Sequence, residues 1–102
     1  MARISILGRK QKQPGDTADF YVDFSEWFDG STPPRTDGPL AYTVTVETGL
    51  TKVYDAINEK VVKVVVSGGT SGKTYKVTVI LTTSAAPEIV KEAEFTVTVL
   101  AV

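Results

Sequence analysis

The stretch from Lys60 to Thr83, KVVKVVVSGGTSGKTYKVTVILTT, most constrains what this chain can fold into. Apolar and polar residues alternate on both sides of a glycine-rich corner, Ser67–Gly72. Successive side chains of a strand point to opposite faces of a sheet, so alternation with β-branched residues predicts two strands. Glycine turns at little steric cost, so the corner predicts a turn. The expected inward-facing residues are Val62, Val64, Val66, Tyr75, Val77, Val79 and Leu81.

The corner SGGTSGKT is one residue away from the phosphate-binding pattern GxxxxGK[ST], with Ser67 in place of the first glycine. That pattern binds phosphate when a helix follows the loop, because the helix N-terminus then points at the phosphates. Here Thr74 is followed by an alternating, strand-like segment. The corner therefore predicts a turn and no nucleotide site.

Tyr75 follows this corner directly. In immunoglobulin-type sandwiches, a tyrosine near the start of strand F bonds back across the corner between strands E and F. The order of strand, glycine corner, tyrosine and strand fits that arrangement. A plain half-buried strand tyrosine is the other interpretation, and both are structural.

The rest of the chain continues the alternation. Strands are predicted over Thr17–Ser25, Leu40–Glu47, Leu50–Ile57 and Val90–Leu100, with a short edge strand over Arg3–Leu7. Expected inward residues are Ala18, Phe20, Val22, Phe24, Leu40, Tyr42, Val44, Val46, Val53, Ala93, Phe95, Val97 and Val99. With no useful helical period, the pattern predicts an all-β, immunoglobulin-like, antiparallel two-sheet β-sandwich of about seven strands. Residues 1–13 form an N-terminal arm or edge strand, and residues 14–102 one domain.

Composition excludes several classes of function. The chain has no histidine and no cysteine, which removes Cys/His zinc sites, thiol nucleophiles and the commonest general base. The carboxylates of Asp19 and Asp23 lie on the expected solvent face, where we expect them to be solvated charges. A net charge of −1 gives no attraction to nucleic acid, and no apolar run is long enough to span a membrane. We expect that the protein is not an enzyme and that it has no catalytic, cofactor-binding or metal-binding residues.

Six residues are candidates for contact with a partner: Arg9, Lys10, Lys12, Trp27, Phe28 and Arg35. The first three form a basic patch that is either a solvated arm or an arm that docks on an acidic neighbour. Trp27 and Phe28 either cap one end of the core or present an aromatic contact beside the loop 29–38, which contains Arg35.

The outer faces of the predicted strands carry threonines together with Val61, Val65 and Ile80. β-branched apolar residues on an outer face indicate either a surface that is covered in the working state or ordinary strand propensity. The sequence leaves both readings open.

Two segments carry a family resemblance: VVSGGTSGKTYKVTVILTTS at residues 65–84 and KEAEFTVTV at 91–99. With DFSEWF at 23–28 and ETGLT at 47–51, they resemble small structural proteins of tailed bacteriophages. The resemblance implies an immunoglobulin-like virion protein that serves as an adaptor, a decoration or a fibre-linked component, and it implies no catalytic residues.

The expected function is a non-enzymatic module of a phage particle that acts by protein–protein docking, as a head decoration or as a head–tail or fibre adaptor. Its partners would be capsid, tail or fibre proteins and further copies of itself, with no cofactor, nucleic acid or membrane. We expect synthesis in the bacterial cytoplasm without a signal peptide, because basic residues directly follow the short apolar run Ile4–Leu7. The alternative is a β-sandwich that binds carbohydrate or a cell surface through Trp27, Phe28 and the loop 29–38.

Overall fold

The computed structural model describes residues 5–7, 11–30, 38–84 and 88–101 of the chain. Strands dominate, and one short helix interrupts them. The elements are β1 (Ser5–Leu7), β2 (Gln11–Lys12), β3 (Thr17–Asp23), α1 (Ser25–Asp29), β4 (Pro39–Val46), β5 (Leu50–Asn58), β6 (Val61–Gly68), β7 (Lys73–Thr83) and β8 (Val90–Val99).

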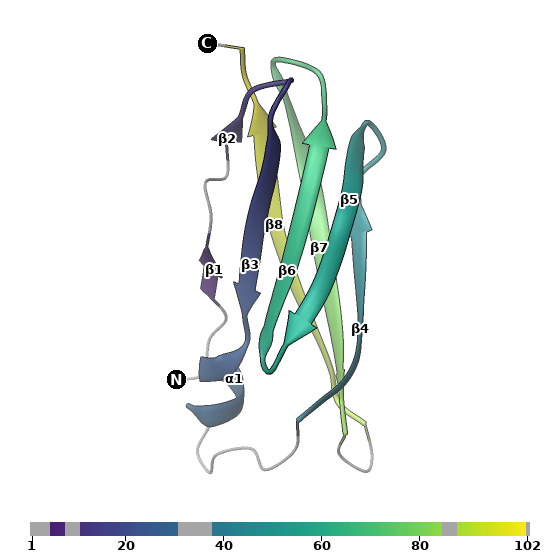
Figure 1. Cartoon of the computed structure of the whole chain (residues 1–102). Helices are drawn as coiled ribbons and strands as arrows, with labels where there is room; N and C mark the ends of the chain where they lie inside the picture. The colour runs from purple at the N-terminus through teal and green to yellow at the C-terminus, as the bar shows by residue number, and fades with distance from the viewer. Residues whose placement is uncertain (1–4, 8–10, 31–37, 85–87, 102) are drawn as a thin grey trace.

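The strands form two four-stranded sheets that pack face to face (Figure 1). One has the order β1-β3-β6-β5 and the other β2-β8-β7-β4. If β1 and β2 are counted as two halves of one first strand, this is the A-B-E-D and C-F-G order of immunoglobulin sandwiches. Counted in the same way, the eight strand segments of the described residues make the seven strands that were predicted. The all-β sandwich is confirmed.

The core lies between the sheets and consists mainly of the strand residues that alternation turns inward, together with Phe28 of α1. Phe20 and Phe95 meet across it, with ring centroids 5.2 Å apart. The predicted inward residues of β6, β7 and β8 are all buried, and those of β3 are buried except Ala18, which is half-buried. Since both sheets have one apolar face, packing these faces together is the arrangement that removes most apolar area from water.

The corner between β6 and β7 is organised around Tyr75. The N–H of Thr70 donates a hydrogen bond to the Tyr75 hydroxyl at 2.8 Å, which confirms the predicted bond back across the corner. Gly49 and Gly69 have φ values of +108° and +94°, and a Cβ on either would approach the Tyr75 ring or Val99 closer than 3 Å. The two glycines thus give both turns their shape and leave room for one ring. Because strand β7 follows the corner, the phosphate-binding geometry is not formed.

The helix α1 was not predicted. It has five residues, and its one buried side chain, Phe28, lies one turn after the buried Phe24, whose carbonyl accepts the Phe28 N–H at 3.1 Å. A helix of little more than one turn places only one apolar pair on a face, so it leaves no periodic signal in the sequence.

Two predicted core residues, Leu40 and Val53, are exposed instead, by 61% and 55%. Each lies at an irregularity in the pairing, between Pro39 and Ala41 in β4 and between Lys52 and Tyr54 in β5. An extra residue in one strand shifts the inward–outward alternation by one position. These two core assignments were therefore wrong.

Candidate interaction surface

The outer face of the sheet β1-β3-β6-β5 carries aromatic and apolar side chains on three adjacent strands. Pairing places Tyr21 of β3 beside Lys63 of β6, with Ala56 of β5 on the other side. These three residues form one cross-strand row, and further rows of outward side chains from the same three strands lie before and after it. We call this surface the tyrosine face; its residues are Asp19, Tyr21, Asp23, Tyr54, Ala56, Asn58, Val61, Lys63 and Val65.

A shallow groove of about 530 Å³ lies on the tyrosine face, between Tyr21 and Tyr54. Lys63 lies within it, with its ammonium 5.8 Å from the centroid of the Tyr21 ring, a cation–π distance. The Tyr21 hydroxyl donates to Asp19 Oδ2 at 3.0 Å. Tyr54 is 55% exposed. The groove therefore offers two aromatic rings, the ammonium of Lys63 and, also in its lining, the carboxylate of Glu59.

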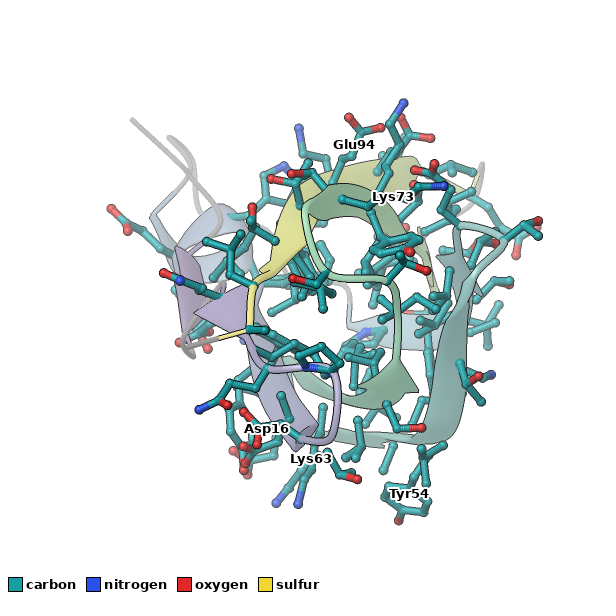
Figure 2. All side chains as sticks on the ribbon, turned by 90° about the horizontal axis from the view of Figure 1, so that it is seen from above. Asp16, Tyr54, Lys63, Lys73 and Glu94 are labelled. Atoms are coloured by element: carbon teal, nitrogen blue, oxygen red, sulfur yellow. The ribbon has the colours of Figure 1, made fainter. Side chains whose placement is uncertain are left out.

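The outer face of the other sheet has a different chemistry. Thr74 and Thr98 share a hydrogen bond of 3.2 Å between their hydroxyls, and Lys76 lies 3.8 Å from Glu94. Figure 2 shows Lys63 and Tyr54 pointing away from the sandwich on one side, and Glu94 on the opposite side. We call this second surface the threonine face; its residues are Ala41, Thr43, Thr45, Thr74, Lys76, Thr78, Ile80, Thr82, Glu92, Glu94, Thr96 and Thr98.

A polar cluster links the two sheets at the side where β4 and β5 lie. The Tyr42 hydroxyl of β4 donates to Asp55 Oδ1 of β5 at 2.7 Å, and Lys52 pairs with the other carboxylate oxygen. The bond from Lys52, followed by that from Tyr42, lowers the pKa of Asp55 below its ordinary value. The same Asp55 bond raises the pKa of Tyr42. We call this group of three the edge clasp.

The basic patch is only partly described. Arg9, Lys10 and also Arg35 lie outside the described residues. Lys12 is 3% exposed, and its ammonium donates to the carbonyls of Gly68 and Gln13 at 2.6 Å each. The prediction of Lys12 as part of a solvated or docking arm does not fit this position, because the charge is turned into the protein.

Trp27 and Phe28 lie in α1, at the end of the sandwich. Phe28 is fully buried, and the half-buried Trp27 contacts it edge-on at 4.8 Å between ring centroids. The prediction that these aromatics cap the core is confirmed. The prediction of Phe28 as a partner contact was wrong, since no part of its side chain reaches the surface.

Sequence reasoning did not single out Tyr21, Tyr54 and Lys63. Alternation places Tyr21 and Lys63 on outer faces, just as it correctly placed Val61, Val65 and Ile80. Two facts that determine this site could not be inferred from the sequence. One is that β3 and β6 are neighbours, and the other is that the irregularity at Val53 turns Tyr54 outward.

Within the described ranges, no group of three or more acidic residues is placed to hold a metal ion. In the same part of the chain, no helix has both the length and the apolar character needed to cross a membrane.

Comparison with known proteins identifies the family to which the chain belongs. No individual curated protein matches it. A family model described as "Podophage GP4 fiber-tail adaptor protein gp77" matches residues 12–98, which include every strand from β3 to β7 and most of β8. The chain therefore belongs to the podophage fibre–tail adaptor family gp77 and has a structural role in the virion.

Proposed function

We propose that this protein joins tail and fibre components of a podophage particle by protein–protein docking, with the tyrosine face as its docking surface. The family description supports the adaptor role. The observation that carries the choice of surface is the groove between Tyr21 and Tyr54, with Lys63 inside it. The role requires no catalysis.

The chemistry of the groove suits a protein partner. Tyrosine is enriched at interfaces because its ring supplies apolar contact area while its hydroxyl bonds to polar groups. The outward valines, Val61 and Val65, add apolar area on the strand between the two tyrosines. Binding energy in such surfaces concentrates in a few central residues, among which tyrosine is common.

Lys63 indicates which kind of partner fits. It lies on β6, the central strand between β3 and β5, so a symmetric pair of tyrosine faces with its two-fold axis at the groove would bring two lysines close together. Like charges at a buried interface oppose association. A different protein that places a carboxylate or carbonyl over Lys63, with apolar groups over the tyrosines, would bind without that cost.

The binding of carbohydrate through Trp27 and Phe28 is not supported in the same way. Phe28 is buried, and the half-buried Trp27 ring packs edge-on against it. We therefore make no proposal for that site.

A complementation experiment tests the docking surface. Phage lacking the gene are supplied with the wild-type protein or the Lys63→Glu variant, and fibre-bearing particles are counted by electron microscopy. We expect Lys63→Glu to reduce their number about tenfold, since losing a central contact that costs about 1.4 kcal/mol of binding free energy weakens binding by that factor. The matched control is Lys76→Glu, which reverses a lysine charge on the threonine face.

Thermal unfolding first establishes that both variants are folded. Tyr54→Ser gives a second test, because this exposed side chain can be removed without opening the core. Normal numbers of fibres with folded Lys63→Glu and Tyr54→Ser would overturn the tyrosine face as the docking surface. Normal fibres in the complete absence of the protein would overturn the adaptor role itself.

A further inference from the structure

The free edge of β4 is a second candidate interface, and the observations that support it do not depend on the tyrosine face. We propose that two copies of the chain associate through this edge, with their β4 strands paired antiparallel, so that the sheets β2-β8-β7-β4 of both copies join into one continuous sheet. The interface is a backbone ladder, and the partner is a second copy of this chain.

The first observation is the direction of the backbone groups. β4 pairs with β7 on one side and is the last strand of its sheet among the described residues. The N–H of Glu47, just after β4, donates to the Lys76 carbonyl of β7 at 3.0 Å. In an antiparallel ladder, alternate residues bond to opposite sides, so Thr43 and Thr45 bond toward β7. The residues between and beside them direct their N–H and C=O groups outward: Tyr42, Val44 and Val46.

The second observation is that this edge lacks the usual protection against strand addition. Natural edges carry charges, prolines or bulges, or they are very short. The edge strand β5 has Lys52, Asp55 and an irregularity at Val53, while β1 and β2 have three and two residues. β4 has no charged residue in its eight, and its proline and irregularity lie at its start. The segment 41–46 is regular and uncharged.

The third observation concerns the inward side chains. The inward residues of β6 and β7 are buried, whereas Tyr42, Val44 and Val46 of β4 are only half-buried, although they pack against the core. A strand added beside β4 would cover the exposed sides of Val44 and Val46. The edge thus combines unpaired backbone groups with apolar side chains that are not fully covered.

The sequence of β4 is a good complement to itself. If Val44 pairs with Val44 of the second copy, then Tyr42 lies opposite Val46 and Thr43 opposite Thr45. Each of the three outward-directed pairs exchanges two backbone hydrogen bonds. Aromatic–β-branched and Thr–Thr pairs are among the favourable cross-strand pairs, and no like charges meet. A two-fold pairing of this kind closes on itself, as most homo-oligomeric interfaces do.

The register gives a sharp test. In the proposed pair, a lysine at position 43 would lie opposite position 45 of the other copy, and the two-fold axis repeats this contact. Thr43→Lys/Thr45→Lys therefore creates two like-charge pairs, and we expect it to weaken the dimer about tenfold. Thr43→Lys/Thr45→Glu creates two opposite-charge pairs instead and should restore it. Both threonines are exposed on the threonine face, so neither variant disturbs the core.

Molecular mass is measured by light scattering from about 1 µM to about 1 mM protein, a range in which a weak specific pair dissociates. We expect the wild-type mass to rise from the 11.0 kDa of the chain toward twice that value. The control is Gln11→Lys/Gln13→Lys, which adds the same charge at exposed positions in and beside β2, at the opposite edge of the sheet.

A wild-type protein that keeps the mass of one chain at all concentrations would overturn the inference. Association that is equally weak in the Lys/Lys and Lys/Glu variants would overturn the register. Neither result would affect the adaptor role, which is read from the number of fibres on the particle.

Discussion

At the scale of single residues, Lys12 shows how a charged side chain can be part of the structure. Its ammonium is buried against the end of β6, where it donates to Gly68 and Gln13 carbonyls. Lys12→Met keeps the apolar stem but leaves both carbonyls without this donor. We expect it to lower the free energy of unfolding by about 1–3 kcal/mol, measured by urea denaturation.

Gln11→Met is the matched control for that measurement, because Gln11 is the exposed neighbour in the same strand. It should change the free energy of unfolding by less than about 0.5 kcal/mol. Equal stabilities for the two variants would show that the bonds of Lys12 contribute nothing.

Tyr75 is the residue for which sequence reasoning went furthest. The glycine corner before it and the alternating strand after it predicted a bond back across the corner, and Thr70 provides it. The role of Gly49 could not be predicted in the same way. Gly49 needs a positive φ because it lies in the turn after β4, which is a local property. Its closeness to the Tyr75 ring arises only when β4 and β7 are paired.

At the scale of elements, the edge clasp joins the two sheets through Tyr42, Lys52 and Asp55. Because the pKa of Asp55 is lower in the folded protein than in the unfolded chain, ionised Asp55 stabilises the fold. This contribution is present above the ordinary pKa of 3.8 and is lost as the pH falls through the folded value. The partly exposed Lys52 keeps it below about 1 kcal/mol.

Asp55→Asn tests the clasp. We expect the variant to be less stable than the wild type at about pH 6 and to differ less from it at about pH 2, where more of the wild-type carboxylate is protonated. Urea midpoints at the two pH values provide the measurement, and Glu88→Gln, an exposed carboxyl outside the clasp, is the control. A stability difference that stays constant with pH would contradict the lowered pKa.

Elements with uninterrupted alternation were predictable, and irregular ones were not. Alternation identified β3, β6, β7 and β8 with their inward residues, since one side chain in two must leave water. The same rule failed at Leu40 and Val53, where an extra residue changes the face. Nothing local in the sequence marks these positions, because bulges depend on how one strand pairs with the next.

At the scale of the whole molecule, the sandwich is elongated, with principal-axis extents of 46 × 22 × 18 Å. The tyrosine face and the β4 edge belong to different sheets (Figure 1). The residues of the candidate site could not be predicted from the sequence, since Tyr21, Lys63 and Tyr54 come from three strands that become neighbours only in the folded sheet.

This separation predicts that the two interfaces are independent. Residues on different sheets that share no partners usually contribute additively. Lys63→Glu should leave the mass of the protein in solution unchanged, as measured by light scattering across the same concentrations. A loss of dimer in this variant would show that the tyrosine face, and not the β4 edge, holds the two copies together.

The parallel pairing of β2 with β8 has a mechanical consequence. Gln11 and Lys12 run in the same direction as Thr98 and Val99, and the Leu100 N–H donates to the Lys12 carbonyl at 2.9 Å. A pull on the chain before β2 and after β8 would slide these strands along each other and load their hydrogen bonds together instead of one after another. An adaptor that carries tension between a fibre and a tail would first resist this tension at the pairing of β2 with β8, where Lys12 is anchored by its own hydrogen bonds.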